Sequence, residues 1–219
     1  PADITSIYDA LHRLRARLSP EDPLLFAVGD GNHSLAAAKA CWEEIKRGLT
    51  PEETVVHPAR FAMVELENIH DDALRMEPIH RVLFGCDGDD LLDEIAAFAA
   101  AKGATLAAGP QAQEIAVVYE GKEVTLSIEG SPYKLAVGTL QAFLDGWLSA
   151  HPQARLDYIH GEDTVRTLVA GEGAVGFLLP TPERDRLFDT IRAEGALPRK
   201  TFSLGSANEK RYYMECRRL

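Results

Sequence analysis

The most constraining feature of the sequence is the stretch 24–38, which reads Leu-Leu-Phe-Ala-Val-Gly-Asp-Gly-Asn-His-Ser-Leu-Ala-Ala-Ala. Its five leading apolar residues predict a short buried strand, and its Ala-rich end predicts a helix that begins at about His33. Gly29 and Gly31 bracket the acidic turn between these two elements. A tight turn from strand to helix leaves the first backbone N–H groups of the helix unpaired and directed at one spot.

This turn is a candidate anion site. The free N–H groups and the positive end of the helix dipole suit a phosphate or a carboxylate. Four polar side chains lie at the same spot, namely Asp30, Asn32, His33 and Ser34. Ordinary turn and capping chemistry is the alternative, because Gly, Asn and Ser are common in such turns. His33 favours a site, since capping does not need an imidazole.

Composition limits the class of protein. The chain has 219 residues, of which 46% are hydrophobic and 26% charged, as in a soluble globular protein. We expect one domain over residues 1–219. The formal net charge of −11 argues against nonspecific nucleic-acid binding and against a polybasic membrane contact. No apolar run reaches the roughly 18 residues of a membrane span.

The cysteines and the first residues bear on localisation and processing. Cys41, Cys86 and Cys216 form no Cys-x-x-Cys pair and have no zinc-ligand spacing, so reduced thiols in the cytoplasm are the simplest interpretation. No signal peptide is recognisable. The chain begins Pro-Ala-Asp, and we expect it to be a processed, truncated or partial product of a longer gene.

Periodicity predicts the order of the elements. Helices are expected over 4–18, 33–47, 89–101, 138–149, 162–170 and 183–193, with a turn or short helix at 50–53. Strands are expected over 24–28, 60–69, 114–120, 122–128, 156–160, 174–179 and 209–217. The two runs that meet at 120–122 form a central β-hairpin. This order predicts an α/β protein, with α+β as the alternative, in which helices flank a mixed sheet.

Two further groups of polar residues are candidates for chemistry. His80 and Arg81 follow Pro78, and as neighbours on extended backbone they point to opposite faces. His160 precedes a glycine at a second strand-to-helix turn and is a candidate general acid or base. The structural alternative makes Arg81 a surface cation and His80 a partly buried donor, and treats the turn after His160 as a plain helix start.

A basic pair lies near the end of the chain. Arg199 and Lys200 are adjacent, and with Thr201 they could hold a phosphate or a carboxylate. The alternative is a solvated loop. His33, His57, His80 and His160 could converge on a metal, but their spacing matches no known ligand motif, so the metal stays unassigned.

Five motifs in order resemble the bacterial and archaeal "domain of unknown function 1015" family. They read Gly-Asp-Gly-Asn-His-Ser-Leu-Ala-Ala-Ala, Pro-Ile-His-Arg-Val-Leu, Tyr-Ile-His-Gly-Glu-Asp, Val-Gly-Phe-Leu-Leu-Pro-Thr-Pro and Leu-Pro-Arg-Lys-Thr-Phe, between about residues 24 and 202. The resemblance implies that this chain is the C-terminal half of a longer protein, whose N-terminal half would carry part of any site.

The resemblance also bears on the turn at 30–34. The usual Asp-Gly-His-His-Arg turn of this family is similar to the phosphate-holding turn of the ParB and sulfiredoxin-like fold, which includes a free serine kinase. Asp30, Gly31 and His33 match that pattern, whereas Asn32 replaces the first His and Ser34 replaces the Arg. The strongest phosphate-binding side chain is therefore absent from this turn. The family's His-Arg, His-Gly and Pro-x-Lys motifs map onto 80–81, 160–161 and 198–200.

The predicted function is an enzyme that binds a nucleotide or a phosphorylated small metabolite and transfers a phosphoryl group, for example to serine. Asp30 would hold Mg²⁺ or a hydroxyl group, and His160 would move a proton. The phosphate would contact Gly31, Asn32, His33 and Ser34, with its charge neutralised by Arg81 and Lys200. The sequence assigns no cofactor, and ADP or ATP with Mg²⁺ is compatible with it.

The alternative is a non-catalytic module that binds a metabolite anion and regulates a partner. In either case the expected partner is a small molecule, neither nucleic acid nor a membrane is expected, and a homo-oligomer is compatible with the sequence. DNA binding by analogy with ParB is disfavoured by the net charge of −11.

Overall fold

The structure is a computed structural model that describes residues 2–205. Within them the chain forms two compact units, a first over residues 2–71 and a second over residues 72–205. The expectation of one domain over residues 1–219 stays a prediction. The predicted strand 209–217, which includes Cys216, lies outside the described residues.

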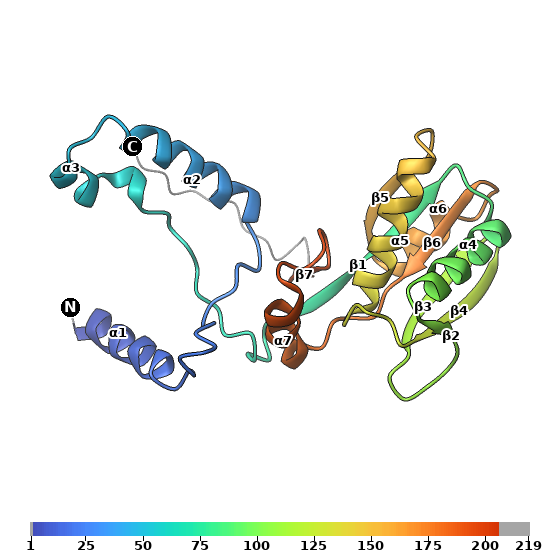
Figure 1. Ribbon diagram of the computed structural model, residues 1–219, viewed down its shortest axis with the longest axis horizontal. Coiled ribbons are helices and arrows are strands. Elements are labelled where there is room, and N and C mark those ends of the chain that lie inside the picture. Colours follow the sequence, from blue (N-terminus) through green and yellow to red (C-terminus); the bar gives the residue numbers. More distant parts are fainter. Residues whose placement is uncertain (1, 206–219) are drawn as a thin grey trace. The chain divides into compact units, whose positions relative to one another are not determined.

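The first unit consists of helices joined by extended chain (Figure 1). Its elements are α1 (Ala2–Arg15), α2 (Asn32–Lys46), α3 (Pro51–Val56) and the 3-10 helix η1 (Pro58–Arg60). The predicted helices at 4–18 and 33–47 are confirmed. The short helix at 50–53 is confirmed as well, because Thr50 and Glu53 form a capping box in which each side chain accepts from the other residue's N–H group.

The strands predicted at 24–28 and 60–69 are absent, and this prediction was wrong. Among the described residues of the first unit, the only β pairing is a bridge between Ser19 and Asp22. The apolar pattern is present, but a strand exists only where another strand satisfies its backbone. Phe26 and Val28, which were expected to be buried, are 52% and 53% exposed.

The second unit is built on one sheet of seven strands (Figure 1). The strands are β1 (Met76–Phe84), β2 (Thr105–Leu106), β3 (Gln113–Tyr119), β4 (Lys122–Glu129), β5 (Arg155–His160), β6 (Ala174–Leu178) and β7 (Phe202–Leu204). Their order is β2-β4-β3-β6-β1-β5, and β7 pairs with the start of β1. Every described pair is antiparallel, where the sequence analysis expected a mixed sheet.

Four helices complete the second unit, namely α4 (Gly88–Ala101), α5 (Ala136–Ala150), α6 (Glu162–Leu168) and α7 (Arg184–Glu194). The α/β class, the flanking helices and the β3–β4 hairpin are therefore confirmed. The central strand β1 is not among the predicted elements, because His80 and Arg81 interrupt its apolar pattern. The short strands β2 and β7 were also missed.

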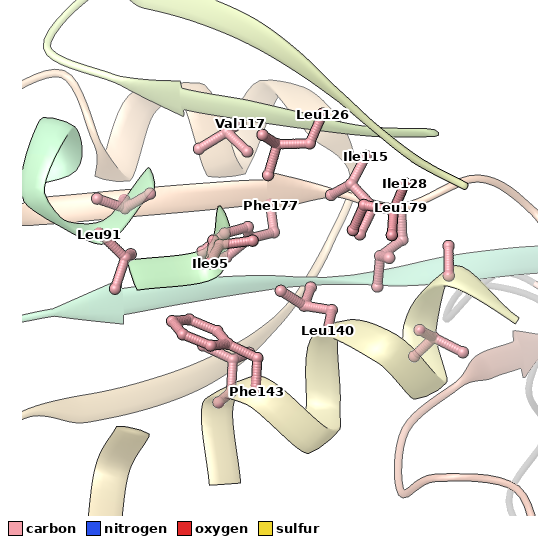
Figure 2. Close-up of a cluster of buried hydrophobic side chains, with 14 of the residues drawn as sticks. Leu91, Ile95, Ile115, Val117, Leu126, Ile128, Leu140, Phe143, Phe177 and Leu179 are labelled. Carbon is pink, nitrogen blue, oxygen red and sulfur yellow. The ribbon is translucent and has the colours of Figure 1, made fainter. Parts of the chain in front are cut away.

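The core of the second unit lies on both faces of the sheet. Successive residues of a strand point to opposite faces, so Leu83 and Val82 of β1 enter different clusters. The larger cluster joins α4 and α5 to the sheet, and Figure 2 shows Ile95, Leu140 and Phe143 of these helices directed at the strands. The smaller cluster packs α6 against β1, β3 and β6.

A close approach at Gly176 yields a stability prediction. A Cβ atom at this position would lie 2.4 Å from Val165 Cγ1 and 2.8 Å from Val118 Cγ2. We expect Gly176→Ala to lower the free energy of unfolding by about 1–3 kcal/mol, because it overpacks the α6 face of the sheet. Urea unfolding followed by circular dichroism measures this change.

Gly146→Ala is the matched control. Gly146 lies inside α5, and its added Cβ would meet nothing within 4 Å. Alanine is a better helix former than glycine, so this substitution should raise stability by about 0.5–1 kcal/mol. Equal effects of the two substitutions would contradict the packing described at Gly176.

Candidate functional site

The predicted site residues are divided between the two units. The turn at 30–34 belongs to the first unit, whereas Arg81, His160 and Lys200 belong to the second. The turn and the three residues of the second unit are therefore considered each within its own unit.

The turn at 30–34 forms the exposed N-terminus of α2. Gly31 has a φ of 74°, the left-handed conformation that glycine adopts without strain, and α2 has no side-chain cap. The Gly31 N–H donates to Asp30 Oδ1 at 2.7 Å, and the Leu35 N–H donates to the Gly31 carbonyl at 2.9 Å. Residues 30–34 are all exposed. The helix half of the predicted strand-turn-helix motif is thus present, and the strand half is absent.

Arg81 is fully buried at the centre of the sheet, with 0% of its surface exposed. Its Nη1 donates to the Lys200 carbonyl at 2.8 Å and its Nη2 to the Arg199 carbonyl at 2.9 Å, with a further bond to the Ile79 carbonyl. Its guanidinium lies 4.9 Å from the centroid of the Tyr158 ring. Burial lowers the pKa of Arg81 to about 10.

These contacts give Arg81 a structural task. Two of its donor atoms hold the loop at 199–200 against β1, so in this conformation they face backbone carbonyls instead of a ligand. The structural alternative, in which Arg81 is a surface cation, was therefore wrong. Its contact with a phosphate stays a prediction.

A polar cluster surrounds the same loop and was missed by the sequence analysis. Arg199 Nη2 donates to Asp145 Oδ1 at 2.8 Å, and Gln141 Nε2 donates to the same oxygen at 2.8 Å. Arg199 Nε also donates to the Tyr158 hydroxyl, and this bond is the main cause of the raised pKa of Arg199. The signal available in the sequence was Asp145, an acid within the otherwise apolar helix α5.

Lys200 lies at the tip of this loop. Its side chain is exposed, and its backbone has a φ of 57°, which is unusual for a residue with a Cβ. Arg81 holds the Lys200 carbonyl, and the Thr201 hydroxyl donates to the Pro198 carbonyl at 2.6 Å. The loop therefore presents two exposed cations, Arg199 and Lys200, on a backbone that the sheet holds in place.

His160 and His80 lie close to one another on the neighbouring strands β5 and β1. His160 is exposed at the end of β5, where it pairs with Ile79, and His80 pairs with Ile159. His80 is only 2% exposed, and its Nδ1 accepts from the Leu179 N–H at 3.1 Å. The expectation of His80 as a partly buried donor was therefore wrong for this nitrogen. Burial lowers the pKa of His80, and the Glu162 carboxylate partly opposes this effect.

Within the described residues, no group of three or more His, Cys, Asp or Glu side chains is arranged to hold a metal ion. None of the described helices is both long and apolar enough to cross a membrane.

The comparisons with known proteins identify a family and a fold. The family described as "Protein of unknown function (DUF1015)" matches residues 1–147. A mutant of a free serine kinase in complex with AMP matches with a TM-score of 0.53 and 17% identity, over 85% of this chain and 70% of that chain. At this identity the likeness shows a shared fold.

Two further structures match less closely. A free serine kinase mutant in complex with ADP has a TM-score of 0.46 and 15% identity, over 78% of this chain and 80% of that chain. A conserved hypothetical protein from Pyrococcus furiosus has a TM-score of 0.44 and 13% identity, over 64% of this chain and 60% of that chain. No curated protein matches the sequence.

The burial of His80 predicts a pH dependence of stability. Its folded-state pKa lies below the ordinary 6.5, so under acidic conditions the unfolded chain binds a proton that the folded chain excludes. The free energy of unfolding should therefore fall as the pH drops below about 6.5, by at most about 1.4 kcal/mol per pH unit. Urea unfolding between about pH 5 and pH 8 measures this slope.

His80→Asn is the matched variant, because its amide oxygen can still accept from the Leu179 N–H while the side chain does not titrate. It should flatten the slope. Glu162, Arg81 and His160 also face His80 electrostatically and remain in this variant. An unchanged slope would show that another group causes the pH dependence.

Proposed function

This chain belongs to the DUF1015 family of proteins of unknown function, and we propose from its candidate site that it is a nucleotide-binding phosphotransferase. It binds a nucleotide or a phosphorylated metabolite at the turn 30–34 and acts on a small hydroxyl-bearing metabolite such as serine. The observation that carries this proposal is the exposed N-terminus of α2, which has no side-chain cap.

The α2 N-terminus has the chemistry that phosphate binding requires. The first-turn N–H groups of this 15-residue helix, which begins at Asn32, are open to solvent. They carry the partial positive charge of the helix dipole, which attracts an anion most strongly within the first turn. His33 and Ser34 add side-chain donors at the same turn.

The fold likeness supports a nucleotide as the ligand. The matched kinase with a TM-score of 0.53 is in complex with AMP. Phosphoryl transfer needs mainly positioned donors and charge neutralisation, and little covalent chemistry from the protein. A site made of backbone N–H groups, Asp30 and His33 is adequate for that task.

Each predicted residue then has a distinct role. ATP or ADP with Mg²⁺ would supply the phosphoryl group. Asp30 would orient the metal or the acceptor hydroxyl, and the N–H groups near Ser34 would hold the phosphate. Lys200 would neutralise charge, and His160 would accept the hydroxyl proton.

The second candidate is a metabolite-binding module without catalysis. The specific observation in its favour is where the arginine side chains lie and what they contact. Ser34 occupies the position where the resembling family has an arginine, and the Arg81 donors are engaged by carbonyls. A site with fewer cations can bind an anion without stabilising the charge of a phosphoryl-transfer transition state.

A ligand screen tests the proposal. We expect the thermal midpoint of the full chain to rise with AMP, ADP or ATP, because a ligand at 100 times its Kd adds about 2.7 kcal/mol to stability. Mass spectrometry of a mixture of protein, ATP, Mg²⁺ and serine should then detect phosphoserine. Binding without turnover would favour the non-catalytic module, and no response to any nucleotide would contradict a nucleotide-dependent phosphotransferase.

A charge change in the first turn of α2 tests the location. Ser34→Asp is favourable for the helix but repels a phosphate, so the Kd for a nucleotide should rise about tenfold, or about 1.4 kcal/mol. Ser34→Arg should instead lower the Kd, because it adds a phosphate-binding fork. Isothermal titration calorimetry measures both.

Ala40→Asp adds the same charge to an exposed position two turns further along α2 and serves as the control. It should leave the Kd close to that of the unsubstituted chain. Equal losses in Ser34→Asp and Ala40→Asp would place the nucleotide elsewhere.

A further inference from the structure

Opposite charges are held side by side where α5, β5 and the loop at 199–200 meet. Arg199 Nη2 and Gln141 Nε2 each donate to Asp145 Oδ1 at 2.8 Å. Arg199 Nε donates to the Tyr158 hydroxyl. These bonds use one carboxylate oxygen and two of the three guanidinium nitrogens, so they occupy neither Asp145 Oδ2 nor Arg199 Nη1.

The position of Arg199 is fixed from the core of the second unit. Arg81 is fully buried, and it donates to the backbone carbonyls of Arg199 and Lys200 at 2.9 and 2.8 Å. The centroid of the Tyr158 ring lies 4.9 Å from the Arg81 guanidinium and 5.9 Å from the Arg199 guanidinium. Arg199 and Asp145 therefore keep a defined spacing, although their side chains are 59% and 51% exposed.

The exposed ion pair itself does little for stability. A pair with this much solvent around it gains little from folding, because water screens the two charges. The neighbouring Lys200 has a φ of 57°, a conformation in which a residue with a Cβ is strained. Strained backbone that presents charged side chains is typical of sites that hold a ligand.

We propose that this cluster binds the α-carboxylate and α-ammonium groups of a free amino acid. Arg199 Nη1 donates to the carboxylate, with which a guanidinium forms strong charge-assisted hydrogen bonds. Asp145 Oδ2 and the Tyr158 hydroxyl oxygen accept from the ammonium group, which has three N–H donors. The four charges then alternate in sign around the site.

The signs of the fixed charges select this class of ligand. Asp145 repels a phosphate or a simple carboxylate, and Arg199 repels a simple amine, whereas a zwitterion satisfies both. His160 lies two residues beyond Tyr158 on β5 and on the same face of the sheet, because side chains alternate along a strand. A hydroxyl-bearing amino acid bound here therefore lies near the proton acceptor of the proposed function, and in this respect the proposal rests on that function.

Equilibrium dialysis of the full chain with labelled L-serine, with and without AMP, tests the site. Two competitors separate the two contacts, namely 3-hydroxypropionate, which lacks the amino group, and ethanolamine, which lacks the carboxylate. We expect serine to bind at least about tenfold more tightly than either, because each competitor leaves one fixed charge without its partner.

Two variants locate the binding. Arg199→Gln and Asp145→Asn should each raise the Kd for serine by about tenfold or more. Asp145→Asn should also reduce the preference for serine over 3-hydroxypropionate, because it removes both the ammonium partner and the repulsion of a simple carboxylate. A purely structural role of Asp145 would leave that preference unchanged.

Arg166→Gln is the control, since Arg166 forms a similarly exposed ion pair with Glu123 at 2.7 Å elsewhere in the second unit. It should leave the Kd for serine unchanged. The proposal is overturned if serine, alanine and glycine all fail to bind at about 10 mM. Equal affinity for serine and 3-hydroxypropionate, or serine binding that Arg199→Gln and Asp145→Asn leave intact, would overturn it as well.

The dialysis also separates this proposal from the proposed function. Serine binding in a chain that responds to no nucleotide would support the amino-acid site and contradict the phosphotransferase. Nucleotide binding in a chain that binds no amino acid would overturn the amino-acid site alone.

Discussion

The buried guanidinium of Arg81 joins β1, β5, α5 and the loop at 199–200 of the second unit. It lies on the central strand β1, faces the Tyr158 ring of β5 and holds the carbonyls of Arg199 and Lys200. A charge buried in this way is tolerated only when hydrogen bonds replace the lost water, so the loop at 199–200 must stay in place. Lys200, whose carbonyl accepts from Arg81, has a left-handed backbone with a φ of 57°.

The two units differ in how their order is maintained. The second unit has an antiparallel sheet with apolar clusters on both faces, so its folding is explained by its own contacts. The first unit has well-formed helices and an exposed, uncapped helix start at 30–34, but no buried side chain among residues 3–71. The turn at 30–34 therefore lies on exposed chain, whereas the described apolar clusters lie in the second unit.

The helices and the hairpin were predictable because their periodicity is a local property. Amphipathic spacing identified α2, α4 and α5, and alternation identified β3 and β4. Most of the elements that the sequence analysis predicted wrongly depend on partners that are distant in the sequence. β1 was not predicted because His80 and Arg81 are polar residues within its apolar pattern. Only in the folded chain do the Leu179 N–H and the carbonyls of the loop at 199–200 supply their hydrogen-bond partners. The segment 24–28 looks like a strand but has no neighbour to pair with in the described first unit.

The sequence alone determined the α/β class, the hairpin, the family resemblance and the helix start at 30–34, because each depends on residues that are close together along the chain. Only the tertiary structure decided that Arg81 is a buried anchor, that Asp145, Tyr158 and Arg199 form one cluster, and that His80 accepts a backbone hydrogen bond. These features depend on which distant groups meet when water is excluded. A linear pattern does not contain that information.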